Sequence, residues 1–188
     1  MNDELQAEAD CMRRFANGDA AAGQFLLDRY LDRLHASVYR WLQDTGDTED
    51  ICQESFLRLW KQAPRWESKA RVGTWLTTVA LNLARDRLRQ RAQREVSALD
   101  VEAEDAAAGP AQQAASSELS EALQQAVRGL PERQREAVLL AHVEQFSQAE
   151  AAAIMGVSEG ALESLLVRAK RALRVPLAAW RAGGHDEQ

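Results

Sequence analysis

The 188-residue sequence predicts an all-α protein, with two small helical domains joined by a flexible acidic linker. Glycine and proline are sparse, at 10 and 4 residues, and no alternating β-branched run appears, so helices are favoured throughout. The helical patterns are interrupted at residues 96–117, a stretch rich in alanine and acids with almost no large apolar side chain. The predicted domains are therefore residues 1–95 and 118–182.

Three helices are expected in the first domain. Residues 24–42 place apolar side chains at alternating steps of four and three, which predicts one buried stripe of Leu27, Leu31, Leu34, Val38 and Trp41. A second helix is expected to begin near Thr48 as its N-cap and to end at Pro64, with Cys52 on its buried side. A third begins near Thr74, and its polar face consists of Thr78, Asn82, Arg85 and Arg89.

The charge of the chain is unevenly distributed. The net charge is −6, which argues against a nonspecific nucleic-acid binder. Residues 64–95 nevertheless hold eight basic and only three acidic side chains. Either this segment contacts a polyanion or it is a solvated helix face, and the local excess favours the polyanion.

Several functional classes receive no support from the sequence. Cys11 and Cys52 are far apart and the three histidines are scattered, which favours a reduced cytoplasmic protein without a metal site. The N-terminus is acidic and polar, unlike a secretory signal, and no apolar run approaches the roughly 18 residues that span a bilayer. No nucleophile–base set or phosphate-binding loop is visible, so neither an enzyme nor a cofactor is expected.

The second domain has the spacing of a helix-turn-helix. Ser147 and Glu150 form a capping box, Gly156 suits the turn, and Ser158 is an N-cap for the following helix. The apolar positions of that helix are expected to face inward: Leu162, Leu165, Ala169 and Leu173. Pro176 is expected to end or kink it.

The outward face of this presumed recognition helix predicts weak DNA binding. It begins with small residues and acids, and its basic side chains come later, so few phosphates would be neutralised. Glu163 would accept a hydrogen bond from a cytosine amino group, pair with Lys170, or face solvent. Because no dimerisation helix is visible, the domain is expected to work while tethered to another DNA-bound protein.

Three segments in order complete a recognisable pattern. They are DTEDICQESFLRLW at residues 47–60, VGTWLTTVALNLARDRLRQR at 72–91, and LPERQREAVLLAHVEQFSQAEAAAIMGVSEGALESLLVRAKRALR at 130–174. The pattern resembles the extracytoplasmic-function (ECF) sigma factors, the small two-domain branch of the bacterial RNA polymerase initiation factors. The resemblance implies binding to core RNA polymerase, reading of the minus-ten and minus-thirty-five promoter elements, and an inhibitory anti-sigma factor as a partner.

The resemblance also implies site residues. The first segment would dock on the clamp helices of the largest polymerase subunit through Asp47, Asp50, Gln53, Glu54, Leu57 and Trp60. The second segment and the loop before it would bind minus-ten DNA through Arg65, Trp66, Lys69, Trp75, Asn82, Arg85 and Arg89. The third would bind minus-thirty-five DNA through Ser158, Gly160, Ala161, Glu163, Ser164, Arg168, Lys170 and Arg171.

Alternatives stay open at this point. Leu57, Trp60 and Trp75 would instead be core residues, and Trp66 would pack back on its domain rather than stack on a base. The family often has threonine, a branched residue and a basic residue where this chain has ALE at residues 161–163, which leaves the promoter sequence open. The rival functions are a stand-alone helix-turn-helix regulator, which would need a dimer, and a helical protein-binding adaptor that does not bind DNA.

Overall fold

The computed structural model describes residues 3–67, 70–98 and 118–183, and every regular element in these ranges is helical, as predicted. The chain divides into two compact units, residues 1–109 and 110–188. Of the predicted linker, residues 96–98 belong to a helix and residues 99–117 lie outside the described ranges. No helix in the described ranges is both long enough and apolar enough to cross a bilayer.

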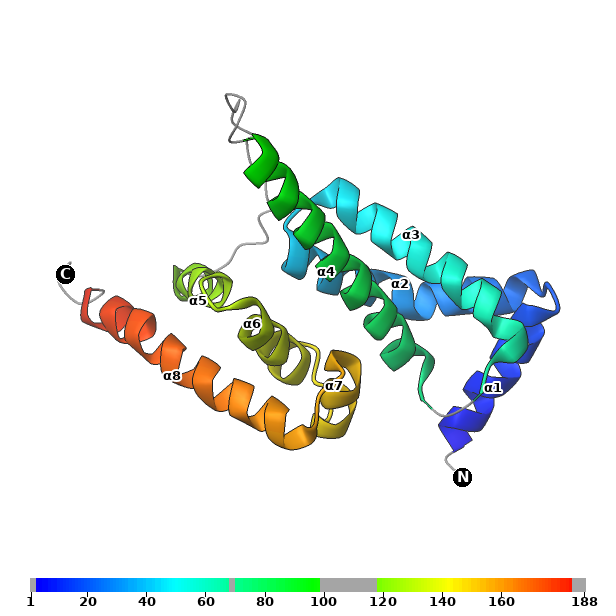
Figure 1. The fold of residues 1–188 in the computed structure, drawn as a ribbon. Helices are drawn as coiled ribbons and strands as arrows, with labels where there is room; N and C mark the ends of the chain where they lie inside the picture. The colour runs from blue at the N-terminus through cyan, green and yellow to red at the C-terminus, as the bar shows by residue number, and fades with distance from the viewer. Residues whose placement is uncertain (1–2, 68–69, 99–117, 184–188) are drawn as a thin grey trace. The chain divides into compact units, whose positions relative to one another are not determined.

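The first unit is a bundle in which α2, α3 and α4 pack against one another (Figure 1). The N-terminal helix α1 packs on α2 and on the short 3₁₀ turn η1. The core is made of fully or nearly fully buried side chains that include Leu26, Val38, Leu59 and Leu76. The elements are α1 (Asp3–Ala16), α2 (Ala20–Leu42), α3 (Thr45–Gln62), η1 (Ala63–Arg65) and α4 (Val72–Ala98).

The turn between α2 and α3 is tighter than predicted, and Thr48 is not its N-cap. Gln43 ends α2 with a left-handed backbone, at a φ of 55°. The next residue, Asp44, caps α3, because its carboxylate accepts the backbone N–H of Asp47 at 2.8 Å. Thr48 is fully buried inside the first turn, where its hydroxyl donates to the carbonyl of Asp44. The helix therefore begins at Thr45, and its N-cap lies four residues earlier than expected.

The predicted stripe on α2 is only half correct. Leu34, Val38 and Trp41 are buried as expected, but Leu27 and Leu31 are each 36% exposed. An α-helix turns by about 100° per residue, so a strict four-three repeat drifts around a straight helix. Over the first half of α2 the buried face is centred on Leu26 instead, and Leu27 and Leu31 lie at its edge.

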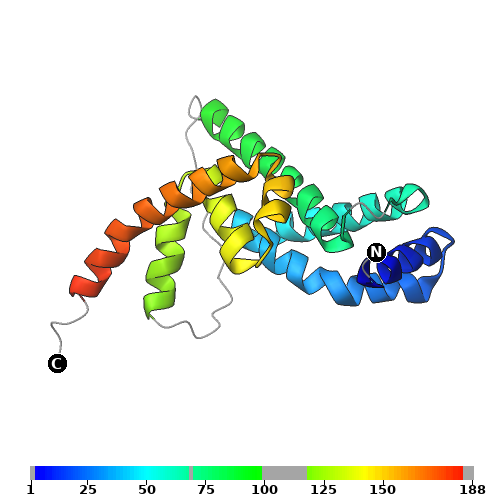
Figure 2. The ribbon, with the colours of Figure 1, turned by 90° about the horizontal axis from the view of Figure 1, so that it is seen from below.

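The second unit is built on the long helix α8, which packs against α5, α6 and α7 (Figure 2). Its core includes Leu130, Val138 and Ala169. The helix α8 does not end at Pro176, because water can solvate the carbonyl of the exposed Ala172 that loses its donor. The elements are α5 (Glu118–Arg128), α6 (Glu132–Val138), the π-helical turn η2 (Leu139–Val143), α7 (Gln148–Met155) and α8 (Glu159–Gly183).

The turn chemistry predicted for the helix-turn-helix is confirmed. Ser147 and Glu150 form the capping box of α7. Gly156 ends α7 with a φ of 65°, a conformation that favours glycine. The Ser158 hydroxyl accepts the backbone N–H of Ala161 at 3.2 Å. These caps fix the angle at which α8 leaves the turn and hence the face that it exposes.

Candidate functional site

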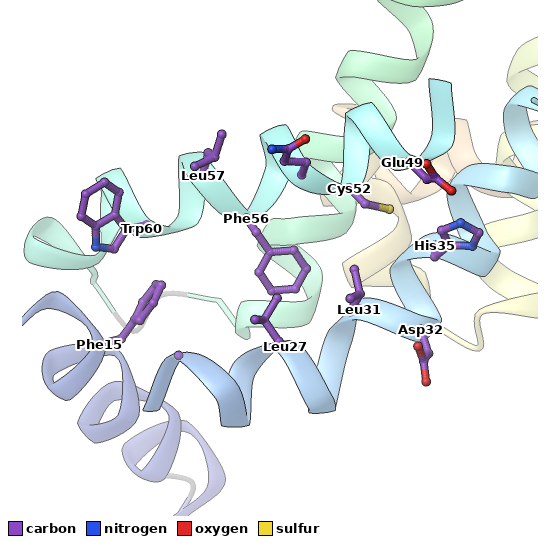
Figure 3. Close-up of a pocket in the computed structure, with 12 residues that line it drawn as sticks. Phe15, Leu27, Leu31, Asp32, His35, Glu49, Cys52, Phe56, Leu57 and Trp60 are labelled. Atoms are coloured by element: carbon purple, nitrogen blue, oxygen red, sulfur yellow. The ribbon is translucent and has the colours of Figure 1, made fainter. Parts of the chain in front are cut away.

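An apolar groove of about 700 Å³ lies between α2 and α3 (Figure 3). Phe56 of α3 and Leu27 of α2 point toward each other across it, and Phe15 of α1 lies near Trp60 at one end. Asp32 and Glu49 add acidic groups to its lining. The two α2 leucines that the sequence assigned to the core thus line this groove instead. Its chemistry suits an apolar surface that carries basic groups.

The exposed edge of α3 carries most of the residues assigned to polymerase docking. Trp60 is 55% exposed and Leu57 is 42% exposed, so neither is a core residue. Asp50 and Gln53 are exposed on the same helix. Glu54 accepts a hydrogen bond from Arg58 at 2.8 Å, which holds the pKa of its carboxyl below the usual range. Large apolar side chains left exposed beside charged ones are typical of a binding surface.

Asp47 lies apart from that exposed edge. Its side chain is only 13% exposed and forms ion pairs with two arginines of α4, Arg87 at 2.6 Å and Arg91. Arg91 also pairs with Asp44 at 2.7 Å, and Arg87 lies 3.7 Å from Asp50. These ion pairs connect the start of α3 to the basic half of α4. Asp47 is therefore placed to orient α4 rather than to meet a partner directly.

The aromatic residues assigned to minus-ten DNA lie side by side. The rings of Trp66 and Trp75 meet edge to face, with centroids 6.0 Å apart and planes at 75°, and both residues are half-buried. Trp66 thus contacts another aromatic side chain of its own unit and stays partly exposed. Arg65 is exposed at the end of η1. Lys69 lies outside the described residues.

The polar residues assigned to α4 form a hydrogen-bonded face. Arg85 donates to the side-chain oxygen of Asn82 at 3.1 Å, and Arg89 pairs with Asp86 at 2.5 Å. Asn82 and Arg89 are exposed, and Arg85 is half-buried. Because these contacts are local and solvent-exposed, they are weak enough to be exchanged for contacts with phosphates.

The outward face of α8 is as predicted. All eight residues assigned to minus-thirty-five DNA are exposed, whereas Leu162 and Ala169 are fully buried against the rest of the unit. Glu163 does not form an ion pair with Lys170, because the two residues lie seven positions apart, which is about two helical turns. Glu163 therefore faces solvent at the start of the helix, where it is available to a DNA base.

Comparisons with known proteins assign both units. Residues 26–94 match sigma-70 region 2, and residues 120–173 match sigma-70 region 4. The chain is 32% identical to the ECF RNA polymerase sigma-E factor of Salmonella typhimurium, covering 86% of this chain and 90% of that protein. The chain belongs to the ECF sigma factors. Proteins of this family direct promoter-specific transcription initiation.

Two further relatives agree with this assignment. The ECF sigma factor SigW of Bacillus subtilis is 28% identical over 88% of this sigma factor and 94% of SigW. The sigma factor RpoE of Bartonella quintana, solved in complex with the anti-sigma factor NepR, matches with a TM-score of 0.68 and 28% identity, over 82% of this chain and 96% of that one. Some relatives are longer, and this sigma factor spans 63% and 65% of two of them.

The sequence did not identify all of the residues that shape these surfaces. Arg87 and Arg91 went unnoticed as partners of Asp47, although DTED and RDRLRQR place acids and arginines at helical spacing. Phe15 was missed because α1 was not recognised as a separate helix. Within the described residues of this sigma factor, no group of three histidine, cysteine or acidic side chains is placed to hold a metal ion.

The two thiols of this sigma factor are expected to react at different rates. Burial, followed by the nearby charge of Glu49, raises the pKa of Cys52 to about 11. At pH 8 its thiolate fraction is then about a hundredfold lower than for a thiol near pKa 9, and only the thiolate reacts. Cys11 is half-buried, and burial raises its pKa as well, but to a smaller extent.

Alkylation with iodoacetamide at pH 8, followed by peptide mass spectrometry, checks this. Cys11 should be modified first in the native protein. Cys52 should react about a hundredfold more slowly than in urea-unfolded protein. Equal native rates for the two thiols would mean that Cys52 is accessible and contradict its burial in the wall of the groove.

Proposed function

We propose that this sigma factor docks on core RNA polymerase through the groove between α2 and α3, together with the exposed edge of α3. The observation that carries the proposal is the exposure of Leu57 and Trp60 beside an open apolar groove. Acidic groups border these side chains, so the partner surface is expected to be apolar and basic. The contact residues are Asp50, Gln53, Glu54, Leu57 and Trp60, while Asp47 acts through its ion pairs to α4.

A second surface of the same unit is proposed to bind minus-ten DNA. Strand opening requires cations for the backbone and a place for unstacked bases. Asn82, Arg85 and Arg89 of α4 would hold the single strand. Arg65, Trp66 and Lys69 would receive a flipped base, with the ring of Trp75 in edge-to-face contact with Trp66.

The second unit is proposed to read the minus-thirty-five element with α8. Ser158, Gly160, Ala161 and Ser164 allow the start of the helix to approach the major groove closely, where Glu163 would accept from a cytosine amino group. Arg168, Lys170 and Arg171 would contact phosphates. Each unit alone would bind DNA weakly, and tethering by polymerase would supply the effective concentration that joins the two weak sites.

We further propose that the protein is a specificity subunit rather than an enzyme and acts in the cytoplasm. An anti-sigma factor is an expected partner, since the relative RpoE was solved with NepR. The groove between α2 and α3 offers such an inhibitor a direct way to exclude polymerase.

Transcription from a pool of promoter fragments tests the proposal. Core polymerase is incubated with the pool, with and without this protein, and the transcripts are sequenced. New transcripts that begin downstream of one shared pair of motifs are expected. Binding to core without any new transcript would contradict the proposed promoter recognition, and failure to bind core would contradict the docking surface as well.

A further inference from the structure

Glu8 joins three helices of the first unit through one carboxylate. It lies on α1 and is 8% exposed. One carboxylate oxygen accepts the hydroxyl of Tyr30, on α2, at 2.6 Å. The other accepts the backbone N–H of Val72, the first residue of α4, at 3.0 Å. The carboxylate thus fixes the place where α4 begins, which the sequence alone put two residues later.

Both hydrogen bonds offset the cost of burying the carboxylate. The N–H of Val72 has no acceptor within α4, because the first turn of a helix lacks preceding carbonyls. The positive end of the helix dipole also favours a negative group there. Burial, followed by the hydrogen bond to Glu8, raises the pKa of Tyr30 to about 12, so its hydroxyl stays a neutral donor at physiological pH.

The packing around this junction leaves little freedom. A methyl group at Gly73 would lie 3.2 Å from a ring carbon of Tyr30, which is tighter than an ordinary contact. The start of α4 therefore lies directly against α2. Helix α1 also packs on η1, and η1 immediately precedes Trp66. Helix α1 thus holds η1 by packing and the first residue of α4 by a hydrogen bond.

Each of these two attachments lies close along the chain to one tryptophan of the pair. Trp66 follows η1, and Trp75 lies in the first turn of α4, yet their rings meet edge to face at 6.0 Å. A shift of the start of α4 would change the position of Trp75 relative to Trp66. The match to sigma-70 region 2 begins at residue 26, so α1 and Glu8 lie outside it.

We infer that Glu8 is a positioning residue for promoter opening, which fixes the start of α4 and thereby the Trp66–Trp75 pair. The inference rests on the proposed function, because it assigns the pair to minus-ten DNA. Glu8 itself touches no DNA. Its loss is expected to impair strand opening while leaving the groove between α2 and α3, and hence core binding, intact.

Two substitutions at the same position separate hydrogen bonding from bulk. Glu8→Leu fills a similar volume but leaves the Val72 N–H and the Tyr30 hydroxyl without an acceptor. Glu8→Gln keeps both links, since its oxygen can accept from Val72 while its amide donates to the Tyr30 oxygen. Asp10→Leu, at an exposed carboxylate of the same helix, is the matched control.

The full-length variants are assembled with core polymerase on a promoter selected from the pool. Core binding is measured by competition with the unaltered protein, and strand opening by the permanganate reactivity of unpaired thymines. Glu8→Leu is expected to bind core within about twofold but to open the promoter about tenfold less, because a buried N–H and a half-buried hydroxyl lose their acceptor. Glu8→Gln and Asp10→Leu are expected to stay within about threefold of the unaltered protein for both measurements.

Three outcomes overturn the inference. Normal opening by Glu8→Leu would show that the junction does not position the aromatic pair. An equal loss of core binding and opening would make Glu8 a support of the whole unit. An equal loss with Glu8→Gln would assign the effect to charge instead of hydrogen bonding. Failure of the unaltered protein to open any promoter would refute the proposed function instead, independently of Glu8.

Discussion

Replacing both Leu57 and Trp60 with alanine is expected to weaken the binding of core RNA polymerase by at least about thirtyfold, the effect of losing one interface hot spot. Both side chains are exposed on α3 beside the apolar groove, and tryptophan is among the residue types enriched at such centres. Their exposure also means that the fold should tolerate the change, within about 0.5 kcal/mol of unfolding free energy. Fluorescence anisotropy of the labelled protein, titrated with core polymerase, measures the affinity.

Phe25→Ala is the matched control for this pair. Phe25 is 50% exposed on α2 of the same unit but does not line the groove. Its replacement is expected to change core binding by less than about threefold. A loss of affinity with Phe25→Ala equal to that of the double variant would mean that exposed apolar area alone matters and would contradict the docking surface.

The second large effect is expected at Leu162, where alanine should destabilise the second unit by about 2–5 kcal/mol. Leu162 is 0% exposed and holds the start of α8 against the helix-turn-helix. Removing its side chain leaves a cavity, which a unit of four helices has little capacity to fill by relaxation. Hydrogen exchange on the full-length protein, read from peptides of α6 and α8, reports the free energy of opening for this unit alone.

Val167→Ala provides the comparison on the same helix. Val167 is 62% exposed, and alanine has the higher helix propensity, so its exchange should stay within about 0.5 kcal/mol of the unaltered protein. Peptides from α2 should be unchanged in both variants. If Leu162→Ala exchanged like Val167→Ala, the inward face assigned to α8 would be wrong.

The parts of the fold that depend on neighbours in sequence could be predicted. The capping box at Ser147, the left-handed Gly156 and the N-cap Ser158 each need only three or four consecutive residues. The inward face of α8, which begins at Leu162, likewise follows from the apolar repeat of one helix alone. The candidate minus-thirty-five surface follows from these elements, because an outward face is fixed once the inward face is known.

Most of the surface features that the sequence did not predict depend on partners far along the chain. Leu27 and Leu31 continue the apolar repeat of α2, but whether they are covered depends on where α3 crosses. Asp47 reads as a solvent-facing acid near the start of a helix until Arg87 and Arg91 are brought beside it by the packing of α4. Local periodicity carries no information about such crossings, so core and groove look alike in the sequence.

The link through Glu8 also has a consequence for how the chain assembles during its synthesis. Tyr30 lies 22 residues after Glu8, and Val72 lies 64 residues after Glu8. The ribosome therefore adds Glu8 first, then Tyr30 and then Val72. At about 5–20 residues per second the start of α4 emerges roughly 3–13 s after Glu8. By then α1 and α2 are already outside the ribosome. When α4 forms, the carboxylate of Glu8 is therefore already available to accept the N–H at its first residue.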